Sequence, residues 1–585
     1  MWFCVIIYLK ECFLMHKNVG PSLAGGRQLA LLPTLLTLLA MLVAACGSSG
    51  GPSTSGQMAP PDKQDFRYSV SAIDDFGSLD PPLIQSATDA YAVQTIFTGL
   101  VQFKNDGTLV DQLAASHTVS SDGLTYSFTL KPGLKFSDGS PLTANDVAYS
   151  INRAISPATK SPVAGYLKLL KDFDKVNSGK MASAIGDSLI VKDDMHLDIV
   201  ISKPAAYFLQ TLTYPTSYVV NKKLIDKYGD KWTDHLNEGA GDGPFMVSSY
   251  NHTKGLDVVP NPNYYGTKPK LQKLQFLFSG DTDTTYKAYL SNQYDYAGVP
   301  SANLDEAKTR PDYHETPALV ISYLSMNYLS KPFDDINVRK AFSLAIDKDL
   351  LVQSVLKGAQ TPTNHYVPEG MLGYNKDLKG LDGTTSTKAN VNMAKQLLQQ
   401  SSYGSAAKLP PITFTYYTGS PTVKNVVTAL AQQWQDTLGV QVKTSAVDFN
   451  KLISLENSTT GNSGPLQLWY LAWQADYPDP QDWLSVFFAK GGDYNQFNFG
   501  QNTGANASQQ QAIQDQLAQA DTTQDQNQRV QMYNDAEQKI SDQAGWIPLY
   551  QNKAHTLINP KLHGFVDTPL GITAPDAWGD VYFTT

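Results

Sequence analysis

The sequence predicts a mixed α and β protein with more than one domain. Strand-like segments, in which apolar and polar residues alternate, are interspersed with helix-like segments, but not in the strict order of a barrel or a doubly wound sheet. The 585 residues exceed the length of one typical domain, yet no Pro- or Gly-rich linker divides them cleanly. We therefore expect lobes built from interleaved segments, with the chain crossing between the lobes more than once.

The clearest strand and helix signals lie in one stretch of the first third of the chain. Tyr126, Phe128 and Leu130 alternate with polar residues, which is typical of a half-buried strand. Further along, Thr143 and Asp146 have the spacing of a capping box, in which the Asp side chain reaches back to the start of the helix. A helix is therefore expected to begin after Thr143.

More elements are predicted in the second half of the chain. Between residues 332 and 358, apolar residues recur at helical spacing in two consecutive stretches, and Gly358 is placed to terminate the second helix. Residues 465–474 form an apolar run, PLQLWYLAWQ, which predicts a buried strand. The aspartates that follow this strand are the main candidates for a functional site.

The first 45 residues have the features of an export signal. The apolar run from Leu31 to Cys46 follows basic residues, ends in small residues and is shorter than a membrane-spanning helix of about 20 residues. Its ending, Val43-Ala44-Ala45-Cys46, resembles a bacterial lipobox, which implies that Cys46 is lipidated; an ordinary secretory signal with an incidental cysteine is the alternative. Residues 1–45 are expected to be removed and residues 46–66 to form a flexible tether.

Composition argues against several classes of partner. The signal holds three of the 45 basic residues and one of the 54 acidic residues, so the mature chain keeps 42 and 53, a charge of about −11. Such a balance argues against nucleic acid and against an extended basic membrane-binding face. Of the three cysteines, Cys4, Cys12 and Cys46, only Cys46 would remain, so the fold is expected to depend on its apolar core and not on disulfides.

Five segments, in order along the chain, resemble the extracytoplasmic peptide-binding proteins that serve ABC importers. They are SLDPPL (78–83), FSDGSPLTANDVAYSINRA (136–154), GDGPFMVSSY (241–250), PFDDINVRKAFSLAID (332–347) and AWQADYPDPQDWL (472–484). Residues 203–235 are most similar to the oligopeptide binders of this family. The resemblance implies two lobes that are hinged around a cleft and close on the ligand, with a small extra domain attached to the first lobe.

The resemblance also implies how the chain is divided and what it binds. The expected parts are a first lobe of residues 67–100, 220–316 and 543–585, an extra domain of residues 101–219, and a second lobe of residues 317–542. The protein is expected to be a monomer without cofactor or metal, anchored by its lipid outside the cytoplasmic membrane. Its expected partners are short peptides and the permease subunits of an ABC transporter.

The three aspartates of the last segment have different expected roles. Pro480 suits the first turn of a helix, which makes Asp479 the N-cap and places Asp482 at the third helical position, near the positive end of the helix dipole. Asp476 has no such task. The resemblance implies that it pairs with the α-amino group of a peptide, and an ammonium with three donors suits a carboxylate in a dry cleft. A role in closing a turn is the alternative for Asp476.

The other ligand contacts implied by the resemblance are backbone groups and aromatic rings. The predicted backbone contacts are Ala472, Trp473 and Gln474 in the strand, and Gln85 to Ala87 in the opening segment. The predicted aromatic walls are Trp473, Tyr477, Tyr470 and Phe449. Extended main-chain pairing would ignore the identity of the peptide side chains; each aromatic ring is equally compatible with an ordinary core.

Differences from the family pattern leave the carboxylate end of a peptide without a predicted partner. Val163 replaces a tyrosine that contacts the ligand backbone in other members, and Tyr470 stands where a member carries a strand arginine. Residues 461–465 read as an insertion of a few residues. The preferred length of the peptide is therefore left open.

Other functions are compatible with parts of the sequence. Members of the family also carry dipeptides, nickel chelates, haem and oligosaccharides, although Asp476 favours a ligand that bears an amine. Paired carboxylates can hydrolyse a glycosidic bond, but the sequence contains neither an H-E-x-x-H motif nor a phosphate-cradling glycine loop. A structural or chaperone-like surface lipoprotein would have no enclosed cleft.

Overall fold

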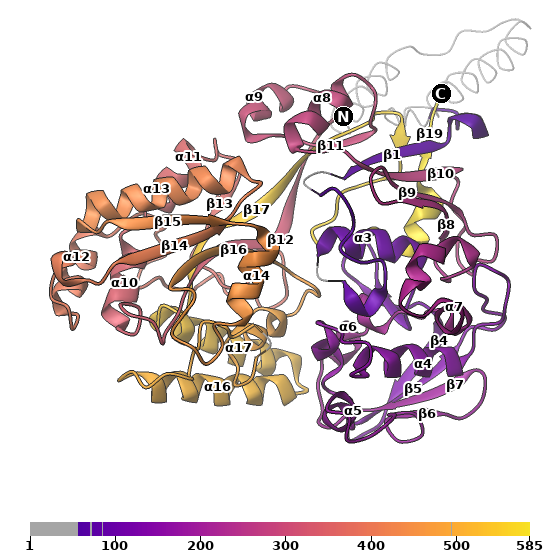
Figure 1. Cartoon of the computed structure of the whole chain (residues 1–585), viewed down its shortest axis with the longest axis horizontal. Helices are drawn as coiled ribbons and strands as arrows, with labels where there is room; N and C mark the ends of the chain where they lie inside the picture. Colours follow the sequence, from indigo (N-terminus) through magenta and orange to yellow (C-terminus); the bar gives the residue numbers. More distant parts are fainter. Residues whose placement is uncertain (1–55, 71–72, 85, 493) are drawn as a thin grey trace, which may run out of the picture. The chain divides into compact units, whose positions relative to one another are not determined.

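Two long strands in the middle of one large sheet connect its two halves (Figure 1). The computed structural model describes residues 56–70, 73–84, 86–492 and 494–585. In it, β12 (Tyr313–Met326) pairs antiparallel with β17 (Ile547–Ile558), and the order of the sheet is β15-β14-β16-β12-β17-β11-β1-β10-β9-β8. The register of this central pair shifts between Pro317 and Ile321, where β12 leaves the first half of the sheet and enters the second.

We call the half that contains β1 and β8 to β11 the first lobe. Its strands are β1 (Asp65–Val70), β8 (Phe245–Asn251), β9 (Gly255–Pro260), β10 (Lys273–Phe278) and β11 (Tyr296–Gly298). Helix α3 (Ala87–Ile96) packs into the same apolar core as these strands. It begins at Ser86, whose Oγ accepts a hydrogen bond from the N–H of Asp89 at 3.1 Å, as is usual for an N-cap serine.

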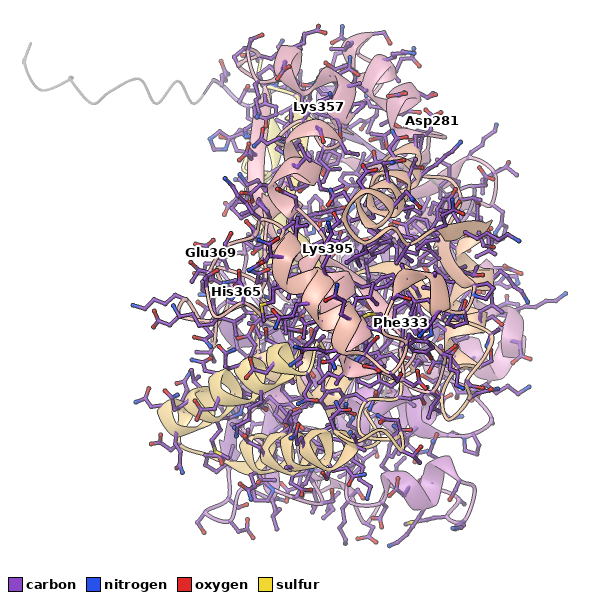
Figure 2. The ribbon with its side chains drawn as sticks, turned by 90° about the vertical axis from the view of Figure 1, so that its left-hand side faces the viewer. Asp281, Phe333, Lys357, His365, Glu369 and Lys395 are labelled. Atoms are coloured by element: carbon purple, nitrogen blue, oxygen red, sulfur yellow. The ribbon has the colours of Figure 1, made fainter. Side chains whose placement is uncertain are left out.

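The second lobe consists of the other half of the sheet and the helices that cover both of its faces (Figure 1). Its strands are β14 (Ile412–Tyr417), β15 (Val442–Val447) and β16 (Leu468–Gln474). One face packs against α10 (Ile336–Leu344), α11 (Lys348–Ser354), α12 (Val391–Gln400) and α13 (Pro421–Leu438). The other face packs against α14 (Phe449–Asn457), α15 (Ser485–Phe488), α16 (Ala507–Thr522) and α17 (Gln526–Asp542). The outer side of the lobe is seen in Figure 2, where Lys395 marks the exposed side of α12.

The predicted buried strand is β16, and both of its faces are covered. Leu468 and Tyr470 pack in the core with α10 to α13, whereas Trp469 and Leu471 pack in the core with α14 to α17. Successive side chains of a strand point to opposite faces of the sheet, so a strand between two helical layers has apolar residues at every position. This explains why the apolar run of residues 465–474 shows no alternation.

A separate four-stranded sheet, with the order β4-β5-β7-β6, forms what we call the extra domain. Its strands are β4 (Ala114–Val119), β5 (Thr125–Leu130), β6 (Leu189–Val191) and β7 (His196–Val200). The alternation predicted for β5 is confirmed, since Tyr126, Phe128 and Leu130 are buried. Helix α4 (Ala144–Ile155) follows, and Asp146 Oδ2 accepts a hydrogen bond from the N–H of Thr143 at 2.8 Å. The predicted capping box is therefore confirmed.

The extra domain and the second lobe are in direct contact. Buried side chains from both, among them Leu167 and Tyr477, belong to one continuous apolar cluster. The ring of Tyr166 also meets that of Tyr477 edge-on, with the centroids 6.4 Å apart. The space between these parts is therefore partly closed, and the remaining cavities are described below.

The predicted class of mixed α and β structure is confirmed, and residues 57–585 form one compact unit. The residue boundaries predicted for the lobes and the extra domain stay a prediction. Cys46, the predicted signal and part of the predicted tether lie outside the described residues.

In the described ranges of the chain, no helix combines the length and the apolar character needed to cross a membrane.

Candidate functional site

A cavity of about 390 Å³ is lined from one side by the first lobe and the extra domain and from the other side by the second lobe. Residues of the first side include Ala87, Tyr91 and Gln94 of α3, and Phe103, Tyr166 and Tyr214. Residues of the second side include Phe449, Ile453 and Glu456 of α14, and Ala472, Trp473, Gln474 and Asp476 at the end of β16. Leu570, Gly571 and Ile572 from the C-terminal segment complete the lining. The cavity therefore has walls from segments that are far apart in the sequence.

One edge of β16 presents unpaired backbone groups at this cavity. On one side, β12 pairs with β16 as far as Gln474. On the other side, β14 pairs with it only at Leu468 and Trp469 in the described part of the sheet. In an antiparallel arrangement the outward N–H and C=O groups belong to alternate residues. Residues 471–474 can therefore offer hydrogen bonds to another extended chain.

Asp476 lies directly beyond this free edge. Its side chain lines the cavity and accepts a hydrogen bond from the hydroxyl of Tyr166, which comes from the extra domain. The Tyr166 ring is itself held by stacking on Tyr214, with the centroids 4.1 Å apart. Burial raises the pKa of the Asp476 carboxyl well above its usual range, because a carboxylate that is removed from water without a cation is costly. A cation in the cavity would favour the ionised form.

Asp482 is fully buried, and its side chain bonds to the backbone of Asp476. Its Oδ2 accepts a hydrogen bond from the backbone N–H of Asp476 at 3.0 Å and another from Nε1 of Trp473 at 3.3 Å. Burial, and then the neighbouring charge of Asp476, raise the pKa of the Asp482 carboxyl. Asp482 is the third residue of the short 3-10 turn that begins after Asp479, as predicted. Its carboxyl group also turns back toward the end of β16 and holds the loop that carries Asp476, a contact that its spacing did not predict.

Asp479 is an N-cap, as predicted, and it is also one half of a buried salt bridge. Its Oδ1 accepts a hydrogen bond from the N–H of Gln481 at 2.9 Å, at the start of a short 3-10 turn; α15 follows instead of one continuous helix. The carboxylate is bonded twice by Arg529 of α17, at 2.8 and 2.5 Å. Gln210 of the extra domain donates to it at 3.1 Å. This aspartate thus joins the loop after β16 to α17 and to the extra domain.

Most of the predicted ligand contacts lie at the cavity, and two aromatic residues do not. Ala87, Phe449, Ala472, Trp473, Gln474 and Asp476 all line it. Tyr477 lies beside it and lines a neighbouring cavity of about 190 Å³ together with Val163.

The prediction for Tyr470 is wrong. This residue is buried on the opposite face of β16, where its hydroxyl bonds to Tyr550 at 2.8 Å and to Ser322 at 3.1 Å. Gln85 lies outside the described residues.

Several lining residues carried no recognisable signal in the sequence. Tyr166, Tyr214 and Gln94 reach the cavity only through the packing of the extra domain and α3. Glu456 stands one turn beyond Ile453 on α14, and its spacing from Phe449 and Ile453 could have placed it on the same helical face. Lys168, five residues after Val163, lines the smaller cavity.

The charges of the site are unbalanced. None of the described residues that line the 390 Å³ cavity is Lys, Arg or His, while two, Glu456 and Asp476, are acidic. No group of three His, Cys, Asp or Glu side chains in the described part of the chain has the arrangement of a metal site. The cavity can therefore hold an extended, hydrogen-bonding ligand that supplies its own positive charge.

Comparisons with known proteins identify the family. Residues 108–495 match the family model described as bacterial extracellular solute-binding proteins, family 5 middle. The oligopeptide-binding protein OppA of Bacillus subtilis is 27% identical over 530 residues, which cover 88% of this chain and 93% of OppA. The probable deoxycholate-binding periplasmic protein YgiS of Escherichia coli is 28% identical over 543 residues, covering 91% of this chain and 96% of YgiS.

The fold agrees with this assignment. The solved structure of the murein tripeptide-binding protein MppA of Escherichia coli matches with a TM-score of 0.76 at 26% identity, covering 90% of this chain and 99% of that chain. The relatives named here are binding proteins and not enzymes. The resemblance and the two-lobed fold that were predicted are thereby confirmed. The chain belongs to the bacterial extracellular solute-binding proteins of family 5.

Proposed function

We propose that this protein captures short peptides with a free amino terminus in the 390 Å³ cavity and delivers them to the permease of an ABC importer. The observation that carries the proposal is the position of Asp476, an acid at the end of a strand with a free edge, in a cavity where none of the described lining residues is basic. The α-ammonium group of a peptide would balance this charge and donate charge-assisted hydrogen bonds. OppA and MppA, which are named for peptide ligands, are relatives.

The backbone of the peptide would bind as an added strand. Residues 471–474 of β16 have outward groups that β14 does not use, and such an edge accepts an extended chain through main-chain hydrogen bonds. With its amino group at Asp476, the peptide would run along β16 toward Trp469. Main-chain pairing contributes affinity that does not depend on peptide sequence.

The anchor and the assembly belong to the same proposal. Cys46 would carry the lipid, the following residues would be a tether, and the working unit would be a monomer outside the cytoplasmic membrane, in keeping with the extracellular family.

The predicted division into a first lobe, an extra domain and a second lobe would let the lobes open at the crossing between Pro317 and Ile321, where the register of β12 shifts.

A ligand without a peptide backbone is the second candidate, because YgiS is named for deoxycholate. Two acids line the cavity, and none of the described residues around it is basic. An anionic ligand would find no positive charge among the described lining residues, and leaving its own charge unbalanced in a poorly solvated space is unfavourable. The charge of the cavity therefore favours a ligand with an amine.

The test of the proposal is to identify what the protein carries. We expect denaturing mass spectrometry of the protein, purified under native conditions from its source, to detect a mixture of short peptides with free amino termini. Protein that has been unfolded, dialysed and refolded is the control and should carry none. A single sugar, metal chelate, haem or bile acid in the native sample would contradict the proposal and support another solute.

The lipid anchor has its own test. Cells that express the protein and are fed an alkyne-tagged palmitate should label it, and replacement of Cys46 with Ser should abolish the label, because the acyl chain needs the thiol. Cys12→Ser, which changes another cysteine of the N-terminal region, should leave the label unchanged. Label that persists in the Cys46→Ser variant would show that the lipobox assignment is wrong.

A further inference from the structure

We propose that Glu456 is a second cation-binding position in the cavity and that it selects peptides with a basic side chain beyond the first residue. This inference rests on the proposed function, because it assumes that a peptide amino terminus occupies Asp476. It adds a specificity that backbone recognition alone does not supply. The argument depends on where Glu456 lies, what its carboxylate touches and which charges surround it.

Helix α14 turns one face toward the cavity, and Glu456 is the polar residue of that face. Phe449, Ile453 and Glu456 all line the cavity, and their spacing of four and three residues places them above one another on the helix. Two of the three are apolar, as expected for a helix packed against a sheet. The third is an acid, which apolar packing alone does not require.

The carboxylate of Glu456 is buried and has spare hydrogen-bonding capacity. Only 6% of the residue is exposed. One oxygen, Oε1, accepts a hydrogen bond from Nε1 of the fully buried Trp469 at 3.0 Å. Within the described residues, Oε2 accepts no hydrogen bond from the protein. Since a carboxylate can accept about four hydrogen bonds, Glu456 can bind a donor from a ligand while it keeps its bond to Trp469.

The described residues around the cavity supply no positive charge to balance Glu456. None of the described lining residues is Lys, Arg or His, and no salt bridge to Glu456 is formed in the described part of the chain. Burial raises the pKa of its carboxyl to about 7, so the group can ionise near neutral pH once a cation arrives. A single charged amino terminus at Asp476 would leave this second acid without a partner.

The two acids lie at different points along β16. Glu456 bonds to Trp469, the second residue of the strand, whereas Asp476 follows the last residue, Gln474. A peptide that begins at Asp476 and runs along the free edge therefore approaches Glu456 with a later residue. An ammonium or guanidinium on a flexible stem can reach a carboxylate in such a pocket. The ligand class is a peptide with a free amino terminus and a lysine or arginine side chain.

The experiment compares lysine with norleucine, which has a similar length but no charge. Tripeptides of alanine with one lysine or one norleucine at position 1, 2 or 3 are titrated into the protein by calorimetry. We expect lysine to be preferred by roughly tenfold or more at position 2 or 3, because a hydrogen bond between charged groups is stronger than one between neutral groups. In Glu456→Gln, which keeps an acceptor for Trp469, the preference should disappear while the norleucine peptide still binds.

Controls separate this inference from the proposed function. Glu369→Gln removes the same charge from the exposed surface of the second lobe (Figure 2) and should leave the lysine preference unchanged. If Glu456→Gln does not fold, Glu456→Asp keeps the charge on a shorter stem and should retain a reduced preference. Equal binding of lysine and norleucine peptides at every position, or a preference that survives in Glu456→Gln, would overturn the inference. If no tripeptide, trialanine included, binds the unaltered protein, the proposed function itself fails.

Discussion

Replacement of Asp476 with Ala is expected to weaken the binding of peptides with a free amino terminus by roughly 30-fold to several thousand-fold. The reason is that removal of one partner from a buried charge pair costs about 2 to 5 kcal/mol. Among the described residues that line the cavity, Glu456 would then be the remaining acid, and it bonds to Trp469 near the start of β16. Calorimetric titration with trialanine measures the effect.

Two further measurements show whether the loss of affinity in Asp476→Ala is caused by removal of the Asp476 charge. Because the hydroxyl of Tyr166 bonds to this carboxylate, thermal unfolding of Asp476→Ala should be recorded to establish that the variant is folded. Glu369→Ala, at an exposed site (Figure 2), is the matched control and should change the affinity less than twofold. If the affinity of Asp476→Ala for trialanine falls by less than about threefold, the loss is well below that expected for a buried pair. This result would show that the Asp476 carboxylate does not bind the amino terminus.

The second large effect concerns stability. Replacement of Asp479 with Ala should lower the free energy of unfolding by about 3 to 5 kcal/mol, because it leaves the guanidinium of Arg529 buried without its salt-bridge partner. Arg529 is 2% exposed and Asp479 is fully buried. The lost N-cap bond to Gln481 adds about 1 kcal/mol. Urea unfolding followed by tryptophan fluorescence measures the change.

A double replacement and a surface variant give this prediction its controls. Asp479→Ala combined with Arg529→Met should recover much of the loss, since no charge is then left buried alone. The exposed pair of Lys222 and Asp226 is the comparison, and Asp226→Ala should cost less than about 1 kcal/mol. If Asp479→Ala costs no more than Asp226→Ala, the salt bridge of Arg529 contributes little to the stability of the fold.

Local sequence signals predicted those parts of the structure that local physics determines. The alternation of β5 and the capping box of α4 each depend on residues that are close together in the sequence, and both are present in the structure. The same holds for Asp479, whose cap bond spans two residues. Strand parity could also have corrected the error at Tyr470. Residues 470 and 473 are an odd number of positions apart on β16, so their side chains point to opposite faces.

The contacts that complete the site join residues that are far apart in the chain. Tyr166 meets Asp476 from 310 positions away, and Arg529 meets Asp479 from 50 positions away. No periodicity in either segment predicts such a pairing, because it depends on how the extra domain and α17 pack against the loop after β16. The second contact of Asp482 was missed for the same reason. Its spacing suits a helix start, but its carboxyl group bonds to the end of the strand.

The most direct test of the proposed function is to compare trialanine with its N-acetylated form on the unaltered protein. Acetylation removes the positive charge, leaves one N–H donor at the terminus and adds an acetyl group, whereas the three residues that β16 would bind stay the same. We expect the acetylated peptide to bind at least roughly tenfold more weakly, and the difference to vanish in Asp476→Ala. Equal affinity for the free and the acetylated peptide would contradict the assignment of Asp476 as the position that binds the peptide amino terminus.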